Sequence, residues 1–326
     1  MRKNIALLAG GDSSEYVISV QSGEQISQIL DKEKFNVYQI HVKGKDWNYF
    51  DAEKRTIPIN KDDFSLEINH EKVKFDCALI LIHGTPGENG ILQAYFDLVK
   101  IPYTTCSFFT SALTFNKFAT KLFVKEYGII TAKSVIVRKN DKINSQDIIK
   151  TVGLPCFVKP NNGGSSFATT KVKEEKELAE AISLAIKEDG NEAIIEEFIK
   201  GTELTNGVYK IKGEKTVLPI TEIVSSKEFF DYEAKYTDGV TQEITPARVS
   251  SEIEARCKAL SAKIYDILDC KGVTRIDYIL RDNELFFLEI NTVPGMSKNS
   301  IVPQQVRAMG GNMTDFYTQI IENSLK

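Results

Sequence analysis

The stretch that decides the fold is a pair of short apolar runs near the carboxyl end. They read Arg275-Ile276-Asp277-Tyr278-Ile279-Leu280 and, after a short polar turn, Leu285-Phe286-Phe287-Leu288-Glu289-Ile290-Asn291. Acidic and amide side chains stand among strand-forming residues. Because strand side chains alternate between faces, Arg275 shares one face with Asp277, and Glu289 shares one face with Asn291. The pattern predicts a β-hairpin with polar side chains set into an apolar sheet.

The turn between the runs decides whether all four polar side chains share one face. If the turn at residues 282–284 has an odd number of loop residues, Asp277 stands opposite Glu289 and Arg275 opposite Asn291. Cross-strand neighbours approach to roughly 5 Å, so the two carboxylates repel unless protons or cations relieve them. An oxygen ligand set of Asp277, Glu289 and Asn291 suits Mg²⁺. The alternative is an internal salt bridge from Arg275, which cannot satisfy both carboxylates and the amide, so we favour the metal interpretation.

Length and composition indicate an ordinary soluble globular protein. The 326 residues suggest two or three domains at roughly 150 residues per domain. With 42% hydrophobic and 26% charged residues, the chain has no disordered or fibrous bias. A net charge of -4 gives no general affinity for nucleic acid or an anionic membrane. Local basic groups must therefore bind any anionic ligand.

Cysteine usage and the amino terminus favour a cytoplasmic location. The five cysteines are scattered and lack the close pairs of zinc or redox motifs, so we expect small core residues in a reducing compartment. The first ten residues contain too short an apolar stretch for a signal peptide. No segment approaches membrane-spanning length.

Strand and helix signals alternate through the first hundred residues and predict a parallel, doubly wound α/β unit. Strands are expected at residues 5–8, 35–41 and 77–82, with helices after Ser22 and near Leu92. The loops 10–15 and 83–90 follow strand ends, where ligands of such sheets bind. Both loops are site candidates.

The rest of the chain predicts a smaller mixed domain and then a second α+β unit. Residues 106–187 contain helices, short strands at 132–137 and 156–159, and a helix after Val172. Strands follow at 193–197 and 215–220, before an amphipathic helix and the hairpin. Ser251 with Glu254 makes a plausible capping box for that helix.

Two segments have the composition of phosphate-binding elements. The strand 156–159 ends in Lys159 and leads into a loop, residues 160–166, whose glycine amides and serine hydroxyls can cradle phosphate. No P-loop or dinucleotide fingerprint is present, so a plain connecting turn is the alternative, which Lys159 weakens. Residues 229–239 crowd aromatic rings with charges, as a mobile lid over an anionic ligand does, although a packed surface loop is an even alternative.

Two single residues are ambiguous when taken alone. Glu15 precedes a helix, where a carboxylate simply favours the helix dipole. His83 closes an apolar strand, where a hydrogen-bonded core histidine is commoner than a ligand. No Ser-His-Asp or Cys-His order indicates nucleophilic catalysis.

Five short motifs in one order resemble the ATP-grasp superfamily and, within it, the D-alanine–D-alanine ligase family. They are Gly10-Gly11-Asp12-Ser13-Ser14-Glu15 with Ile18-Ser19; His83-Gly84-Thr85-Pro86-Gly87-Glu88-Asn89-Gly90; Lys159-Pro160 with Gly164-Ser165-Ser166; Asp231-Tyr232-Glu233-Ala234-Lys235-Tyr236; and Arg275-Ile276-Asp277, followed by Glu289-Ile290-Asn291-Thr292-Val293-Pro294-Gly295-Met296 and Ser300-Ile301-Val302-Pro303. The match spans nearly the whole chain.

The resemblance implies the fold and the activity. The fold is α/β and α+β: an ATP-grasp fold with an N-terminal doubly wound parallel α/β domain at 1–104, a central lid-like subdomain at 105–190 and a catalytic domain at 191–326. The implied activity is ATP-dependent ligation of two D-alanines through a D-alanyl phosphate for peptidoglycan precursor synthesis, in a cytoplasmic homodimer. The alternatives are another ATP-grasp carboxylate–amine ligase and a nucleotide-binding regulatory or inactive relative.

The resemblance also assigns roles to residues that bind ATP and metal. Lys117 and Lys159, with the loop residues Gly164, Ser165 and Ser166, would hold ATP phosphates. Glu196 would bind the adenine amino group, Glu203 the ribose hydroxyls and Lys235 the γ-phosphate. Asp277, Glu289 and Asn291 would bind two Mg²⁺ ions, with Mn²⁺ a possible substitute.

The substrate roles follow in the same way. Glu15, held by hydrogen bonds with Ser165 and Tyr236, would anchor the ammonium of the first D-alanine, with His83 nearby. Ser300 and the Ile301 amide would hold the second substrate's carboxylate. Arg275 and the Gly295 amide would face the developing oxyanion. In the resembled family, tyrosine at the position of Tyr236 accompanies dipeptide rather than ester synthesis.

One departure from the family pattern concerns the phosphate loop. The family usually continues Ser-Ser-Val-Gly, and this chain has Ser165-Ser166-Phe167-Ala168. If the glycine uses a positive φ, Ala168 cannot adopt that conformation cheaply. We therefore expect a differently shaped loop.

Overall fold

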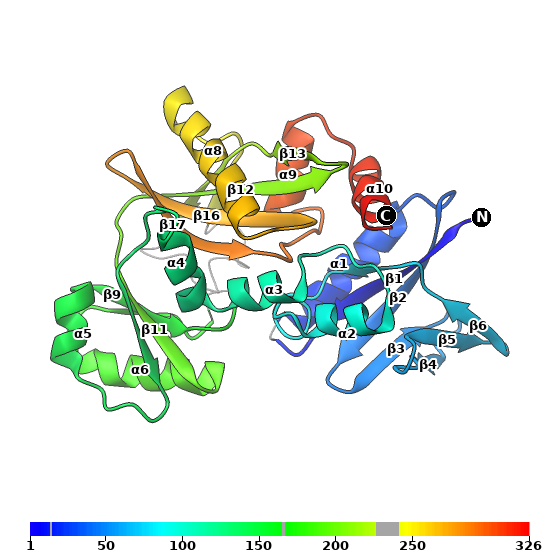
Figure 1. Ribbon diagram of the computed structural model, residues 1–326, viewed down its shortest axis with the longest axis horizontal. Coiled ribbons are helices and arrows are strands. Elements are labelled where there is room, and N and C mark those ends of the chain that lie inside the picture. The colour runs from blue at the N-terminus through cyan, green and yellow to red at the C-terminus, as the bar shows by residue number, and fades with distance from the viewer. Residues whose placement is uncertain (14, 165–166, 226–240, 326) are drawn as a thin grey trace.

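The structure is a computed structural model that describes residues 1–13, 15–164, 167–225 and 241–325. It contains three units, each built on its own β-sheet, with the helices α3 (Phe108–Phe115) and α4 (Lys117–Lys125) running between them (Figure 1). No helix among the described residues is long and apolar enough to cross a membrane. All five cysteines are unpaired and buried, as the scattered pattern predicted.

The first unit has a five-stranded sheet in the order β4-β3-β2-β1-β7. Strand β1 (Lys3–Gly10) runs parallel to β2 (Phe35–Lys43) and to β7 (Cys77–Ile80), while β3 (Asp46–Phe50) and β4 (Thr56–Pro58) form an antiparallel edge. A two-stranded ribbon of β5 (Ser65–Ile68) and β6 (Glu71–Lys74) packs beside it. Alternate β1 side chains enter two cores, one containing α1 (Tyr16–Ile29) and one containing α2 (Ile91–Val99). The doubly wound prediction is therefore confirmed at the parallel centre of the sheet.

Helix α1 begins at Tyr16, earlier than the predicted start after Ser22. Its first turns bury small polar residues instead of a clear apolar stripe. Ser19 accepts a hydrogen bond from the Gly10 amide at 2.9 Å and donates one to the Leu81 carbonyl at 2.8 Å. A helix that packs on a sheet through serine and glycine has no strong apolar periodicity. The sequence pattern therefore does not reveal the first half of α1.

The central unit has an antiparallel sheet in the order β10-β9-β11-β8. Its strands are β8 (Ser134–Arg138), β9 (Cys156–Pro160), β10 (Thr170–Val172) and β11 (Glu192–Glu197), and its helices are α5 (Ser145–Val152) and α6 (Glu175–Asp189). The expected boundary at residue 190 needs correction, because β11 fills the position between β9 and β8. The unit therefore continues to the end of that strand.

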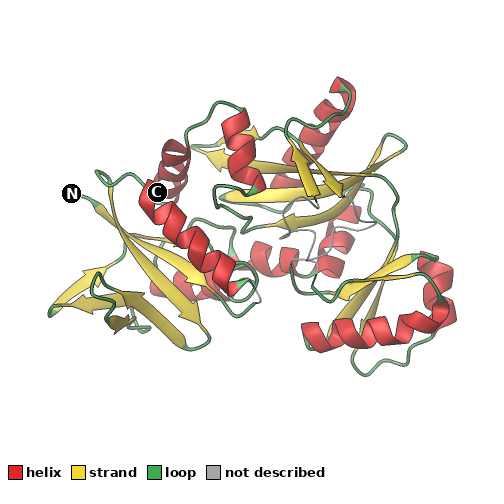
Figure 2. Cartoon of the chain, turned by 180° about the vertical axis from the view of Figure 1, so that it is seen from behind, coloured by secondary structure: helices red, strands yellow, loops and turns green. Residues whose placement is uncertain are grey.

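The third unit has a six-stranded sheet that follows β15-β14-β12-β16-β17, with β13 paired to β12. The strands are β12 (Thr202–Ile211), β13 (Glu214–Val217), β14 (Thr221–Ser225), β15 (Thr241–Ile244), β16 (Val273–Arg281) and β17 (Glu284–Asn291), and the helices are α8 (Ser251–Ile267), α9 (Ile301–Ala308) and α10 (Met313–Ser324). Helices α5 and α6 cover the outer side of the central sheet and α8 that of the third. The two sheets thus face one another across the middle of the molecule (Figures 1 and 2).

The cap of α8 is one residue earlier than the sequence suggested. Ser250 is the N-cap, and its hydroxyl accepts a hydrogen bond from the Ile253 amide at 3.3 Å. The predicted capping box from Ser251 is wrong, because Ser251 already lies in the first helical turn. Adjacent serines offer two possible caps, and the backbone conformation of the first one decides between them.

The β16–β17 hairpin places the four polar side chains as expected, but for a different reason. The loop has two residues, Asp282 and Asn283, both with positive φ (49° and 64°), as in a type I′ turn. The odd-numbered loop, which was the condition for a shared face, is therefore absent. A β-bulge between Asp277 and Tyr278 shifts the register by one residue, and only beyond it does Asp277 face Glu289 and Arg275 face Asn291.

Candidate active site

A cleft of ≈ 1080 Å³ lies between the facing sheets and the loops of the first unit. A volume of this order accommodates a nucleotide together with small substrates. Every described residue that the sequence assigned to the site lines it: Glu15, His83, Lys117, Lys159, Gly164, Glu196, Glu203, Arg275, Asp277, Glu289, Asn291, Gly295, Ser300 and Ile301. Ser165, Ser166, Lys235 and Tyr236 lie outside the described residues.

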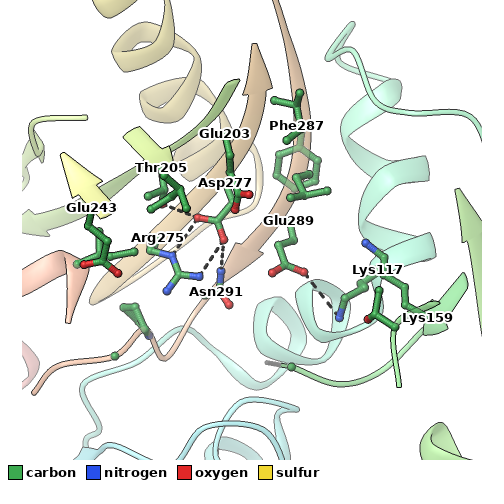
Figure 3. Close-up of a pocket in the computed structure, with 18 of the residues that line it drawn as sticks. Lys117, Lys159, Glu203, Thr205, Glu243, Arg275, Asp277, Phe287, Glu289 and Asn291 are labelled. Atoms are coloured by element: carbon green, nitrogen blue, oxygen red, sulfur yellow. Dashed lines mark hydrogen bonds and ion pairs between the residues drawn. The ribbon is translucent and has the colours of Figure 1, made fainter. Parts of the chain in front are cut away.

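Asp277 is the centre of a hydrogen-bonded group on the hairpin. Arg275 donates to both of its carboxylate oxygens, from Nε at 2.9 Å and from Nη2 at 2.8 Å, and Asn291 Nδ2 donates at 3.0 Å (Figure 3). Thr205, on the neighbouring strand β12, also donates its hydroxyl to Asp277. Burial alone would lower the pKa of Arg275, but the attraction of Asp277 outweighs it and raises that pKa. The salt bridge that the sequence left as an alternative is thus present in this state.

Glu289 lies on the same sheet face as Asp277 and reaches toward α4. Its carboxylate lies 3.8 Å from Nζ of Lys117, the first residue of that helix (Figure 3). Lys117 also donates to the carbonyl of Gly163 in the glycine-rich loop, residues 160–166. Burial lowers the pKa of Lys117, and Glu289 opposes that shift. One lysine therefore contacts both the loop expected to hold phosphate and a carboxylate expected to hold metal.

Glu196 is buried between two lysines. Lys159 Nζ lies 2.6 Å from Oε2, and Lys121 pairs with Oε1. Burial by itself would raise the pKa of Glu196, but the two ammonium groups lower it to about 2. Burial likewise would lower the pKa of Lys159, and the attraction of Glu196 and Glu289 raises it instead. The carboxylate and Lys159 are therefore both held in their charged forms.

The loops of the first unit meet the third unit and the glycine-rich loop at one end of the cleft. Glu15 is the N-cap of α1, and a Cβ added to Gly164 would lie 3.4 Å from Glu15 Oε2. His83 Nδ1 lies 2.8 Å from the Val293 carbonyl. Glu88 Oε1 accepts from the Val293 amide at 3.4 Å, and burial raises the pKa of Glu88 against the attraction of His83. These contacts fix the segment that carries Gly295.

Ser300 and Ile301 form the amino end of α9, where a helix presents free amides to an anion. The Ser300 hydroxyl lies 2.8 Å from that of Ser297. A Cβ at Gly295 would lie 2.8 Å from Ser300 Oγ, so a larger residue there would displace the serine. The close packing keeps the Gly295 amide, the serine hydroxyl and the helix end together.

Ala168 adopts a φ of 51°, in the left-handed region that glycine usually occupies. The chain therefore keeps a backbone conformation that favours glycine although the residue is alanine. Such a conformation costs about 1–2 kcal/mol in a non-glycine residue. Ala168 follows the glycine-rich loop, residues 160–166, so the strained residue lies just beyond that loop.

The residues around the hairpin have the chemistry of a divalent cation site. Two carboxylates and a carboxamide oxygen from one sheet face line the cleft, and hard cations prefer such ligands. No group of three or more His, Cys, Asp or Glu side chains that could hold a metal occurs in the described part of the chain, because the third candidate ligand is the Asn291 amide. We conclude that the donor set fits Mg²⁺ in type.

Sequence reasoning missed several residues that support the site. They are Lys121, which pairs with Glu196; Thr205, which donates to Asp277; Glu88, which holds the 293 segment; and Glu222 with Arg248, a bidentate pair on the cleft wall. Only Lys121 gave a usable signal, because it lies four residues after Lys117 and therefore on the same face of α4. The others are contacts between distant segments.

Comparison with known proteins gives a consistent result along the chain. The family model described as "D-ala D-ala ligase N-terminus" matches residues 4–106, and the one described as "D-ala D-ala ligase C-terminus" matches residues 123–322. Proteins named D-alanine–D-alanine ligase from Flavobacterium johnsoniae and Phocaeicola vulgatus are 51% and 50% identical, each over 99% of both chains.

Solved structures agree with the sequence relatives. The VanG D-Ala:D-Ser ligase from Enterococcus faecalis is 31% identical with a TM-score of 0.86, over 99% of this chain and 100% of its own. A D-alanine–D-alanine ligase from Bacillus anthracis complexed with ATP is 28% identical with a TM-score of 0.79, over 99% and 97% of the two chains.

Proposed function

This chain belongs to the D-alanine–D-alanine ligase family, and from that premise we propose that it joins two D-alanines with ATP to give D-alanyl-D-alanine, ADP and phosphate. The observation that carries the proposal is the composition of one cleft. It brings Lys117, Lys159 and Arg275 together with the oxygen ligands of the hairpin and the amino end of α9. Peptidoglycan precursor synthesis is the process that uses this product.

The first step joins a carboxylate to a phosphoryl group. An oxygen of the first D-alanine's carboxylate attacks the γ-phosphorus, the bond to the bridging oxygen breaks, and ADP leaves. Two anions must approach, so fixed cations are required. Lys117 and Lys159 would hold the ATP phosphates, with Glu196 on the adenine amino group and Glu203 on the ribose. Glu15 would hold the first ammonium, near His83.

The hairpin would supply the metal site for this step. Asp277, Glu289 and Asn291 would hold two Mg²⁺ ions, with Mn²⁺ a possible substitute, and the bound ions would neutralise charge on the transferring phosphate. From the sequence alone, Lys235 is assigned to the γ-phosphate. Residues 229–239, assigned to a lid from the sequence alone, would keep water from the acyl phosphate.

The second step joins the acyl phosphate to an amine. The amino nitrogen of the second D-alanine attacks the acyl carbon, and the C–O bond to phosphate breaks after a tetrahedral oxyanion forms. Arg275 and the Gly295 amide would face that oxyanion, while Ser300 and the Ile301 amide hold the second carboxylate. Tyr236 favours an amine rather than D-lactate as the second substrate.

Substrate-dependent phosphate release tests this function. We expect ATP and Mg²⁺ to give phosphate with D-alanine as the sole amino acid, and the product to be the dipeptide. D-serine and D-lactate offered as second substrates should compete poorly. Phosphate release that requires a different acid or amine would favour another ATP-grasp ligase, the alternative reading, and nucleotide binding without turnover would favour a regulatory relative.

The cellular location and the oligomeric state also belong to the proposal. We expect a cytoplasmic homodimer, with no nucleic-acid or membrane partner. Light scattering at micromolar concentration measures the mass, and a monomer under assay conditions would contradict the dimer.

A further inference from the structure

Six charged side chains of the cleft are paired with one another. Lys117 with Glu289, Lys159 with Glu196 and Arg275 with Asp277 form three ion pairs along its wall. In the family's assignment, the two lysines bind phosphate, whereas their partners Glu289 and Glu196 bind metal and adenine. Each lysine is therefore paired with a carboxylate that a bound metal ion or nucleotide would also contact.

We propose that Lys117 is a stand-in cation at the metal site, so that nucleotide and divalent ion bind well only together, by exchanging the Lys117–Glu289 pair. Nucleotide phosphate would draw the ammonium away, and the ion would then take its place on the carboxylate. This inference rests on the proposed function, since it takes the ligands from there.

The position of Lys117 supports such an exchange. Its side chain is 11% exposed and that of Glu289 is 27% exposed, so the pair is only weakly screened by water. Lys117 is also the first residue of α4, where the helix dipole disfavours a cation and favours an anion. Because its Nζ already contacts the glycine-rich loop, a phosphate bound there would reach it with little movement.

Glu196 and Glu289 differ in whether each keeps a positively charged partner after its lysine turns to a phosphate. Glu196 has a second partner, Lys121, and stays neutralised if Lys159 turns to a phosphate. Among the described residues, Glu289 has one ion pair within 4.0 Å, the one with Lys117. When the Lys117 ammonium moves to a phosphate, the negative charge of Glu289 is no longer neutralised, and a divalent ion can neutralise it. Nucleotide without metal and metal without nucleotide are both disfavoured, and linkage makes this coupling reciprocal.

The first test measures metal binding without nucleotide. Mn²⁺ is titrated against the full chain by electron paramagnetic resonance, in wild type and Lys117→Met. We expect the variant to bind Mn²⁺ roughly tenfold more tightly, inside the usual range of about 5- to 150-fold for coupled sites. Lys258→Met is the matched control, because it removes a half-buried lysine that pairs with Glu254 on α8, outside the cleft, and it should leave the Mn²⁺ affinity unchanged.

The second test measures nucleotide binding without metal and stays informative if Lys117→Met fails to fold. ADP is titrated calorimetrically in excess EDTA against wild type and Glu289→Gln. Because the amide no longer holds the ammonium, Glu289→Gln should bind metal-free ADP several-fold more tightly than wild type. Glu254→Gln, at the surface pair, is its control.

The outcomes separate this inference from the proposed function. Unchanged or weaker Mn²⁺ binding in Lys117→Met, or unchanged or weaker metal-free ADP binding in Glu289→Gln, would overturn the stand-in role. D-alanine-dependent phosphate release by wild type would still support the ligase. No ADP binding by wild type even with Mg²⁺ would instead remove the proposed function itself.

Discussion

Gln305 offers the sharpest test of how the fold holds the site. It lies on α9, four residues after the start of the helix, and its side chain is fully buried. Its Oε1 accepts from the Gly207 amide at 2.8 Å, and its Nε2 donates to the Thr205 carbonyl at 3.0 Å and to Thr221 Oγ1 at 2.9 Å. Strand β12 changes partner here from β14 to β13. Gln305 therefore provides hydrogen-bond partners for the β12 backbone groups that lie where the strand changes its neighbour.

The cost of losing Gln305 follows from those contacts. Gln305→Ala leaves two buried backbone groups, the Gly207 amide and the Thr205 carbonyl, without their partner. Each costs about 1–3 kcal/mol. The Thr221 hydroxyl keeps Thr245 Oγ1 at 2.6 Å, so it adds little. We expect destabilisation of about 4 kcal/mol, from twice the middle of that range.

Urea unfolding followed by far-ultraviolet circular dichroism measures this cost. Gln305→Met fills the volume without hydrogen bonds and should be nearly as unstable as Gln305→Ala. The control Gln304→Ala removes a half-buried neighbour that donates to Glu243 and to the Asn299 carbonyl, and it should cost about 1 kcal/mol, well below Gln305→Ala. We also expect the apparent KM of the second D-alanine to rise more than that of ATP, because Ser300 begins the same helix. Recovery of stability by methionine would show that packing, not hydrogen bonding, matters here.

Three further predictions concern the cleft. Arg275→Ala should lower kcat far more than it raises the KM of either substrate, because in the proposed mechanism the guanidinium would contact the oxyanion, which forms only in the transition state; steady-state kinetics with normal kcat and a raised KM would contradict this. Because the folded pKa of Glu196 is about 2 against an ordinary 4.5, its ionised form stabilises the fold above pH 4.5 and this contribution disappears as the pH falls toward 2. The difference in thermal midpoint between wild type and Glu196→Gln should therefore narrow over that window, and a constant difference would refute the assignment. Ala168→Val should lower the thermal midpoint, whereas Ala168→Gly should not, because a β-branched residue fits a φ of 51° poorly; equal midpoints for the two variants would argue against backbone strain.

The sequence predicted which residues line the cleft better than it predicted the contacts that support them. The motifs at Glu15, Lys159 and Arg275 each lie where an element begins or ends, and local patterns mark such positions. Their described members all line one cleft. Gln305 and Thr205, by contrast, act on segments far away in the chain, and no local pattern records a partner one hundred residues distant. Long-range hydrogen bonds of this kind are set by packing and not by periodicity.

The failures have equally specific causes. The start of α1 was missed because Ser19 and Ser22 replace the apolar residues that mark a helical face. The cap of α8 was misplaced by one residue because Ser250 and Ser251 are chemically equivalent caps. The sequence placed Asp277 opposite Glu289 only if the loop were odd, and the bulge that places them so cannot be read from a run of apolar residues. In each case the competing local choices differ little in energy.

The extra residue in β17 divides the hairpin into two halves of opposite phase. Toward the tip, Leu285 and Phe287 enter the core, whereas beyond the bulge Ile290 does so and Glu289 and Asn291 turn to the cleft. Lengthening or shortening the tip by matched pairs of residues preserves this phase. Leu288 is the unpaired residue of the bulge, so deleting it would restore regular alternation along β17 and leave Glu289 opposite Asp277.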